Sequence, residues 1–333
     1  MSANQSLQMP ALAWLAPMSG STDAPFRRQA VKFGAKAVVS EMVAGESLVA
    51  GRPDVVRRMC RHEGVGPWIV QLAARRPEDM RAGADLLSDA GVDVIDINMG
   101  CPAKQVTGGQ SGSALMRDLD LATRIIDAAI EGGAGTPVSL KMRLGWDHDT
   151  LNAPELAQIA ERLGVCWVTV HGRTRSMFYK GRADWSAISA TAKNIDIPVV
   201  ANGDIGSLED AETAVAESGA KAVMIGRAAM GQPWLIGQLE ASLSGTPYRI
   251  PDLEAQFQGL AEQIQDSVDL YGDRLGVRIV RKHVSAAIDQ IDLPAFGPHR
   301  RAVRSRLCQI DDAAALIHAL ESLYAGRLEP IAA

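Results

Sequence analysis

Cys101 lies between a glycine and a proline in the stretch DINMGCPAKQV (96–106), directly after a run that is typical of a buried strand. Such a thiol could be a nucleophile with His171 as its base, a metal ligand, or a proton donor to a substrate carbon. Metal binding has the least support, because His171 and scattered carboxylates lack the spacing of a zinc site, and we predict no metal. The glycines at 108, 109 and 112 indicate a loop that could move over a bound ligand.

Other polar residues occur where further predicted strands end. They are Gln71, Asn98, Lys141, Arg143, His171 and Arg173. Each alone could serve the structure, for example by satisfying loop backbone or by pairing with a core carboxylate. If the strands are parallel, however, their carboxyl ends meet on one face, and so many polar groups there indicate an active site.

Two glycine-bearing motifs, Asn202-Gly203-Asp204 and Gly226-Arg227, follow the last two predicted strands. Backbone N–H groups at such turns can hold a phosphate, and an arginine adds a charge-assisted contact. The same glycines could instead form two tight turns of the barrel that bind no ligand. The pattern favours an anion site.

The elements that position these residues repeat along the chain. Eight short apolar or β-branched runs are each followed by a helical pattern. The runs are Trp14–Ala16, Ala37–Ser40, Trp68–Leu72, Val94–Asn98, Val138–Met142, Trp167–His171, Pro198–Ala201 and Ala222–Ile225. Eight βα units predict an α/β fold of the TIM (β/α)8 barrel type. An open doubly wound sheet is the alternative, but LAPMSGSTD after the first strand lacks its G-x-G-x-x-G turn.

The strand pattern stops after Gln238. We predict a barrel domain over residues 1–240, a linker over 241–252 and a small helical domain over 253–333. The amphipathic helices expected in that last domain span Leu253–Tyr271, Val277–Asp289 and Arg301–Tyr324.

Positive charge is concentrated in the predicted helical domain. The segment from Arg274 to Arg306 holds eight Lys or Arg and two acids, a surplus of +6 in a chain whose net charge is −5. The remainder of the chain therefore carries about −11. A solvated helical face or a nucleic-acid-binding surface would have this composition.

Composition indicates a globular cytoplasmic enzyme. The 333 residues are 47% hydrophobic and 22% charged, and no apolar stretch approaches the length of a membrane span. The four cysteines form no C-x-x-C pair, which argues against a disulfide framework. No obligate protein partner is evident.

Six ordered motifs give the chain a resemblance to the tRNA-dihydrouridine synthases, most similar to the bacterial B-type subfamily. They are LAPMSGSTDAPFR, INMGCPAKQV, LKMRLGWD, VTVHGRTRSMFYKGRADW, VVANGDI and MIGRAAMGQPW. The resemblance implies a barrel that holds FMN and a helical tail that meets tRNA. It also implies NADPH-dependent reduction of the C5–C6 double bond of a D-loop uridine, with position 17 as the expected target.

The same resemblance implies a role for each candidate residue. Cys101 would be the general acid that protonates C5, and an ordinary thiol, with a pKa of about 8.5, is mainly protonated at neutral pH. Asn98, His171 and Arg173 would hold the polar edge of uracil. The residues implied to contact FMN are Pro17, Met18, Gln71, Lys141 and His171 at the ring, and Asn202, Gly203, Asp204, Gly226 and Arg227 at the phosphate.

Two other functions remain open from the sequence. A flavin enzyme that reduces a free pyrimidine or another small enone would use the same barrel without needing a basic tail. A non-catalytic tRNA-binding protein would not need Cys101 or the phosphate motifs, and both are present.

Overall fold

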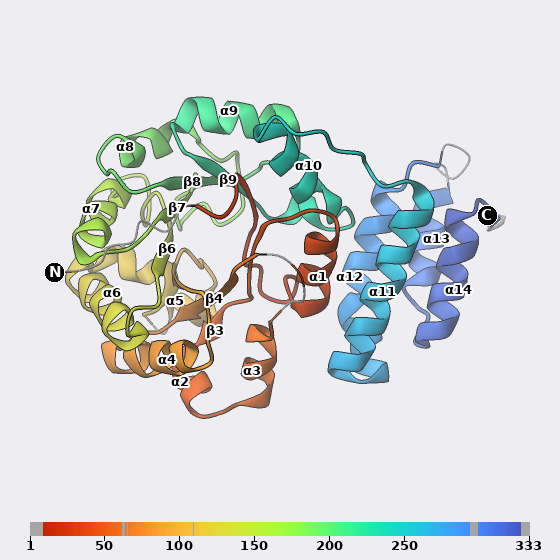
Figure 1. Ribbon diagram of the computed structural model, residues 1–333, viewed down its shortest axis with the longest axis horizontal. Helices are drawn as coiled ribbons and strands as arrows, with labels where there is room; N and C mark the ends of the chain where they lie inside the picture. The colour runs from red at the N-terminus through yellow and green to blue at the C-terminus, as the bar shows by residue number, and fades with distance from the viewer. Residues whose placement is uncertain (1–8, 62–63, 65, 109, 294–298, 328–333) are drawn as a thin grey trace.

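A ring of parallel strands inside a ring of helices forms the larger part of the molecule, and helices α11 to α14 form a second body beside it (Figure 1). The computed structural model describes residues 9–61, 64, 66–108, 110–293 and 299–327. Gly109 and two parts of the predicted helical domain, 294–298 and 328–333, lie outside the described residues.

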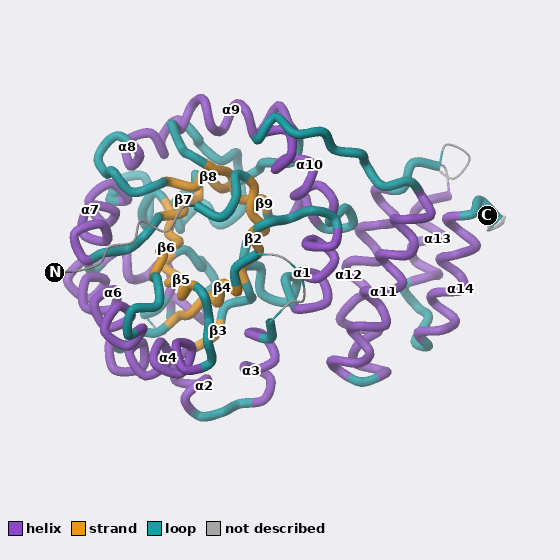
Figure 2. Tube along the Cα trace, in the orientation of Figure 1, coloured by secondary structure: helices purple, strands orange, loops and turns teal. Residues whose placement is uncertain are grey.

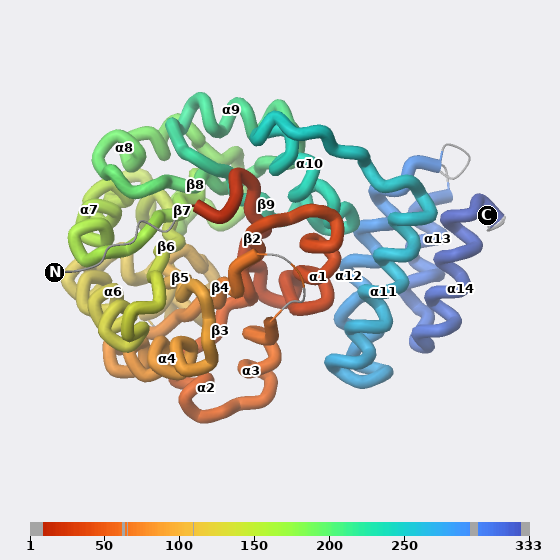
Figure 3. Tube along the Cα trace, viewed as in Figure 1, coloured from red at the N-terminus to blue at the C-terminus, as the bar shows by residue number. Residues whose placement is uncertain are grey.

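The strands close into a barrel, as predicted. They are β1 (Ala13–Leu15), β2 (Ala37–Val39), β3 (Val43–Ala44), β4 (Trp68–Ala73), β5 (Val94–Met99), β6 (Val138–Arg143), β7 (Val168–His171), β8 (Val199–Asn202) and β9 (Ala222–Ile225). Each pairs in parallel with its neighbours, and β1 joins β9 to β2 while β2 also pairs with β4. Figure 2 shows the strands at the centre, and in Figure 3 the chain can be followed from red at the N-terminus through the barrel to the blue helical domain.

The second of the eight predicted strands is interrupted. Residues 40–42 leave the sheet after β2, and β3 then resumes pairing along β4, with Val43 opposite Leu72. At the break the Ser40 hydroxyl replaces a backbone acceptor, because Gln71 N donates to Ser40 Oγ at 3.0 Å. The break turns Glu41 toward the β1–α1 loop, where its carboxylate accepts from the Gly20 N–H.

Inward-pointing side chains are apolar at the barrel floor and polar near its mouth. Residues of a strand point alternately inward and outward, so β5 contributes Val94, Asp96 and Asn98 in successive layers. Trp14 and Trp167 fill the floor with ring centroids 5.1 Å apart. The apolar layer closes one end of the barrel, and the polar side chains lie at the other end, around the cavity.

Helices surround the barrel, and the longer ones cover it with apolar faces. The helices are α1 (Ala24–Lys32), α2 (Gly45–Val49), α3 (Pro53–Met59), α4 (Pro77–Asp89), α5 (Lys104–Thr107), α6 (Leu119–Gly133), α7 (Ala153–Leu163), α8 (Ser189–Ala192), α9 (Leu208–Ser218) and α10 (Trp234–Leu243), with 3-10 turns at Gly112–Arg117, Ser186–Ile188 and Arg227–Ala229. In α4 the buried residues Met80, Gly83, Ala84 and Leu87 follow the spacing of one helical face.

The helical domain consists of α11 (Leu253–Tyr271), α12 (Asp273–Gln290), α13 (Arg300–Leu307) and α14 (Ala313–Tyr324). The first two helices match predicted ones within a few residues, but the single helix expected over 301–324 is wrong. The chain breaks at 308–312, where Asp312 caps α14 by accepting from Ala315 N at 2.7 Å. Helix α10 extends to Leu243, three residues into the segment predicted as a linker.

Helices α11 and α12 pack against α1 of the barrel. Ion pairs of 2.5 Å join Arg28 to Asp266 and Lys32 to Glu262. Behind them the His283 ring lies 4.4 Å from the Phe26 ring, centroid to centroid. Among the described helices none has both the length and the apolar composition to cross a membrane.

Candidate active site

A cavity of about 940 Å³ opens at the carboxyl ends of the strands. All the residues predicted to be catalytic, cofactor-binding or substrate-binding line it: Pro17, Met18, Gln71, Asn98, Cys101, Lys141, His171, Arg173, Asn202, Gly203, Asp204, Gly226 and Arg227. The barrel geometry therefore brings together side chains that are spread over more than 200 residues of sequence.

Cys101 begins a loop, and hydrogen bonds hold both its backbone N–H and its carbonyl. Asn98 Oδ1 accepts from the N–H groups of Gly100 and Cys101, at 3.2 and 3.0 Å. The Cys101 carbonyl accepts from the Ser113 hydroxyl at 2.9 Å. Gly112, with a φ of +60°, lies so close that a Cβ there would be 2.9 Å from the Cys101 carbonyl oxygen. The half-buried thiol is thus held at a defined place on the cavity wall.

Lys141 is buried beside the cavity and is oriented by Asn202. Its Nζ donates to Asn202 Oδ1 at 3.0 Å, while Asn202 Nδ2 donates to the Met224 carbonyl at 2.7 Å. Burial, and then the positive charge of Arg143, lower the pKa of Lys141 to about 8. Lys141 is therefore mainly protonated at neutral pH, but it loses its proton more easily than an ordinary lysine does.

Arg143 connects the Cys101 loop to the loop after β7. Its guanidinium donates to the carbonyls of Gly100, Thr174 and Phe178, each at 2.8 Å. Burial lowers the pKa of Arg143 to about 10, and the residue stays charged at neutral pH. Arg143 therefore supports the cavity wall and places a positive charge near Cys101.

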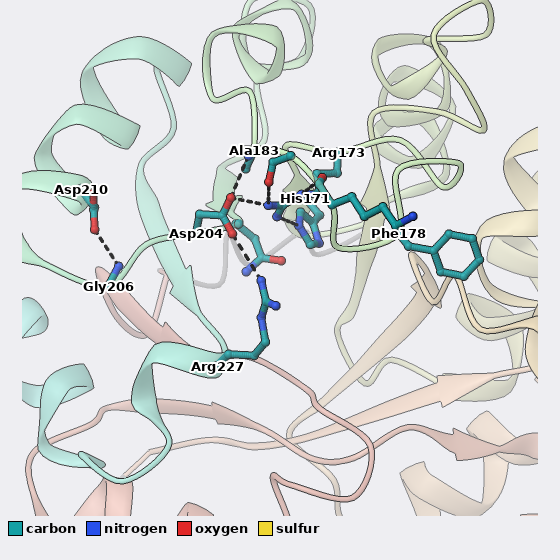
Figure 4. A network of polar contacts seen from close by, with 12 residues as sticks. His171, Arg173, Phe178, Ala183, Asp204, Gly206, Asp210 and Arg227 are labelled. Atoms are coloured by element: carbon teal, nitrogen blue, oxygen red, sulfur yellow. Dashed lines mark hydrogen bonds and ion pairs between the residues drawn. The ribbon is translucent and has the colours of Figure 1, made fainter. Parts of the chain in front are cut away.

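His171, Arg173, Asp204 and Arg227 form one polar network (Figure 4). Arg173 donates to Asp204, to His171 Nε2 at 3.2 Å, and to the carbonyls of Lys180 and Gly181. Because Arg173 can only donate, His171 Nε2 accepts and the ring proton of neutral His171 lies on Nδ1. Burial and the surrounding cations hold the pKa of His171 well below its usual value. A neutral ring with its Nε2 engaged is poorly placed to act as the base for Cys101.

The two glycine motifs lie on the same wall of the cavity. Gly203 has a φ of +118°, and a Cβ there would be 2.9 Å from His171 Cδ2, so only glycine fits. The indole N–H of Trp185 donates to the Gly203 carbonyl at 2.7 Å and fixes the turn. Gly226 follows β9 directly, beside Met18. At this wall the backbone of Gly203 and Gly226 and the side chain of Arg227 can all face a ligand.

Residues outside the predicted set also belong to the site. Asp96 is buried beneath it, and Tyr179 and Arg58 line the cavity. The inward alternation along β5 was a signal for Asp96, which lies two residues before Asn98 on the same strand. Arg58 is on α3 and Tyr179 is in the loop after β7, and neither had such a signal.

Lys282 of α12 lies at the edge of the cavity. Its Nζ is 3.5 Å from the place where a Cβ on Gly20 would be, and the adjacent Ser19 and Ser21 line the cavity. Two other cations of the basic segment differ: Arg281 pairs with Asp311, and Arg304 pairs with Asp289 at 2.5 Å. Part of the predicted positive surplus thus holds the helical domain together.

Comparison with known proteins agrees with this geometry. The model of the dihydrouridine synthase family matches residues 14–321. The chain is 43% identical over 324 residues to a "Probable tRNA-dihydrouridine synthase" of Rhodobacter capsulatus, covering 97% of both chains. It is 39% identical over 310 residues to "tRNA-dihydrouridine synthase B" of Proteus vulgaris, covering 93% of this chain and 94% of that one.

Among solved structures, a complex of 2-naphthoyl-CoA reductase with 2-naphthoyl-CoA has a TM-score of 0.50 at 13% identity, over 71% of this chain and 50% of that one. At this identity the similarity shows the fold alone. The family match covers nearly the whole chain, and two relatives above 30% identity span it. The chain therefore belongs to the dihydrouridine synthase family.

Proposed function

We propose that this protein is a tRNA-dihydrouridine synthase that reduces the C5–C6 double bond of a D-loop uridine, with FMN as cofactor and NADPH as reductant. One observation carries the proposal: Cys101 is held on the wall of a cavity large enough for a flavin and a base, opposite glycine turns suited to a phosphate. The relatives named above support tRNA as the substrate.

The residues present fit FMN. Gly203 and Gly226 let the backbone approach a phosphate, and the positive charges of Arg173 and Arg227 outnumber the negative charge of Asp204 between them. Pro17, Met18 and Gln71, which also line the cavity, would border the ring system. When bound, FMN would supply the hydride that adds to C6 of uracil, and NADPH would replenish its electrons.

Lys141 would present its ammonium group to a carbonyl oxygen of the flavin or to O2 of uracil. Asn202 holds the amine in place, so little side-chain freedom is lost when a ligand arrives. The lowered pKa of about 8 still leaves the amine mainly protonated at pH 7.

Cys101 would complete the reduction. Hydride addition to C6 leaves negative charge spread over C5 and the C4 carbonyl, and the S–H proton of Cys101 passes to C5 to form the second new C–H bond. The sulfur keeps the bonding electrons as a thiolate, and the nearby charges of Arg143 and Lys141 attract it. Solvent would then return a proton to the sulfur.

Asn98 and Arg173 would act by positioning, rather than by holding the uracil edge as the sequence suggested. Asn98 Oδ1 is engaged by the backbone of the Cys101 loop. Arg173 is almost fully buried, and its donors meet protein acceptors, so it orients His171 and Asp204. The Nδ1–H of His171 remains to donate to the ligand.

A uridine inside a folded tRNA must leave its stack to enter the cavity. Arg58 on α3 and Lys282 on α12 flank the mouth, where they could contact the phosphates next to the extruded base. A free pyrimidine would have no use for cations in these positions, and their presence favours RNA as the substrate.

Incubating the protein with FMN, NADPH and unmodified tRNA tests the proposal. Mass spectrometry of the digested tRNA should show a uridine in the D-loop that has gained two hydrogen atoms, with position 17 as the first place to look. Free uridine should neither react comparably nor compete. Unmodified tRNA together with reduction of free uridine would favour the small-substrate alternative instead.

A further inference from the structure

We propose that Asp96, buried beneath the cavity, is a positioning residue that sets the direction of a hydrogen-bond chain ending at the Cys101 backbone. The chain consists of Asp96, Gln71 and Asn98. The proposal rests on the role given to Cys101 above, since it explains how that thiol is held where it can protonate C5.

Each link of the chain is short. Gln71 Nε2 donates to Asp96 Oδ2 at 2.7 Å, and Asn98 Nδ2 donates to Gln71 Oε1 at 2.6 Å. Asn98 Oδ1 then accepts from the N–H groups of Gly100 and Cys101. Gln71 and Asp96 face each other across the β4–β5 register, which brings the first link into contact. Three side chains thus connect the barrel centre to the loop.

The direction of the chain follows from the chemistry at its two ends. Asp96 Oδ2 is the acceptor at one end, and Gln71 turns its NH2 toward it. Backbone N–H groups can only donate, so Asn98 must turn its oxygen toward the Cys101 loop. The two amides between these ends then have one arrangement that satisfies every group. Reversing them would set an NH2 against two N–H donors.

Ser139 completes the surroundings of the carboxylate. Its hydroxyl donates to the other oxygen, Asp96 Oδ1, at 2.7 Å. Burial raises the pKa of Asp96, while the hydrogen bonds from Gln71 and Ser139 and the charge of Lys141 act in the opposite direction. Ser139 therefore supports the same carboxylate through a bond of equal length but stands outside the chain to Cys101.

Three variants separate the directional role from general support of the fold. Asp96→Leu removes the acceptor at the start of the chain. Ser139→Ala is the matched control, because it removes a hydrogen bond of the same length to the same carboxylate and leaves the chain intact. Asp96→Asn should keep the direction, since its oxygen can face Gln71 while its NH2 faces the Ser139 hydroxyl, which can turn to accept.

The measurement is hydrogen exchange of the Gly100 and Cys101 amides by NMR in the FMN-loaded protein without tRNA. We expect exchange at both amides to be roughly tenfold faster in Asp96→Leu, and within about twofold of wild type in Ser139→Ala and Asp96→Asn. If Asp96→Leu does not fold, Gln71→Met breaks the next link and should give the same acceleration.

Three results would overturn the proposal. One is unchanged exchange at Gly100 and Cys101 in the variants that break the chain. A second is equal acceleration in Ser139→Ala, which would show that loss of stability alone loosens the loop. The third is equal acceleration in Asp96→Asn, which would mean that the negative charge, and not the direction of the chain, is what matters. Because no substrate is present, these results do not depend on whether Cys101 protonates uracil.

Discussion

Arg173 and Arg227 approach the same carboxylate, Asp204, but only one of them is placed to bind a ligand. The side chain of Arg173 is 2% exposed, whereas that of Arg227 is 62% exposed and lies 3.4 Å from the carboxylate. An exposed guanidinium in a loose ion pair can turn to a phosphate at little cost. Arg227 is therefore the residue that should recognise the FMN phosphate directly.

Replacing Arg227 with Ala should weaken FMN binding by roughly tenfold, since one charge-assisted hydrogen bond is lost. Flavin fluorescence during titration of the stripped protein measures this. Arg182→Ala is the control, because Arg182 is an exposed arginine that does not line the cavity. Equal FMN affinity in both variants and in wild type would place the phosphate elsewhere.

Many of the residues that line the cavity could be predicted from the sequence, but their contacts could not. Polar residues at the ends of parallel strands must share a face, and this alone grouped Lys141 with Asn202. That the two touch depends on strand register. The saturated donors of Arg173 depend on the loop after β7, whose path no periodic pattern describes. The sequence therefore could not show that the donors of Arg173 are taken up by protein acceptors.

Helix α12 shares the contact between the two bodies of the molecule with α11, and its part of the contact is tightly packed. Its His283 stacks on Phe26 of α1, and Gly231 of the loop before α10 packs so closely that a Cβ would be 2.4 Å from the Ala286 backbone. Burial, and then the charge of Lys282, lower the pKa of His283 to about 3. The packing thus requires a neutral histidine.

This packing predicts a loss of stability in acid. In the unfolded chain His283 has a pKa near 6.5, whereas in the folded protein its pKa is about 3. Between these two values only the unfolded state binds the proton, so the free energy of unfolding falls as the pH drops below 6.5. Between pH 6 and 5 wild type should lose about 1 kcal/mol more than His283→Leu. Urea unfolding of both proteins at the two pH values measures this. Equal losses would show that His283 can be charged in the fold.

Regular elements could be predicted from the sequence more closely than their interruptions. Strands and long helices follow from periods of two and about 3.6 residues, and β5 and α11 lie where those patterns place them. The break after β2 depends on a tertiary contact, the Ser40 hydroxyl with Gln71 N. The break before α14 had a local signal in its capping residue, Asp312, but no glycine or proline marks it.

At the scale of the whole molecule, the barrel contains the cavity and the helical domain brings one cation to its mouth. Lys282 lies beside the β1–α1 loop, whereas its neighbour Arg281 is turned to Asp311 within the helical domain. The two residues carry the same charge on the same helix but face different surroundings. We therefore expect the position of each cation, and not the overall net charge, to decide which of them contacts RNA.

Lys282→Ala should weaken tRNA binding and flatten the plot of log affinity against log salt by a little under one unit, as expected for one lost phosphate contact. Arg281→Ala removes the same charge and should leave the slope unchanged. Filter binding across a salt series measures both. A slope that changes equally in the two variants, or in neither, would contradict a docking role for Lys282.

Single-turnover reduction of tRNA by the prereduced enzyme shows whether Cys101 gives the proton to C5. In Cys101→Ala we expect NADPH to reduce bound FMN at the wild-type rate, while dihydrouridine forms about 100-fold more slowly or less. Cys60→Ala, which changes a half-buried cysteine that does not line the cavity, should react like wild type. Formation of dihydrouridine by Cys101→Ala at the wild-type rate would contradict the account.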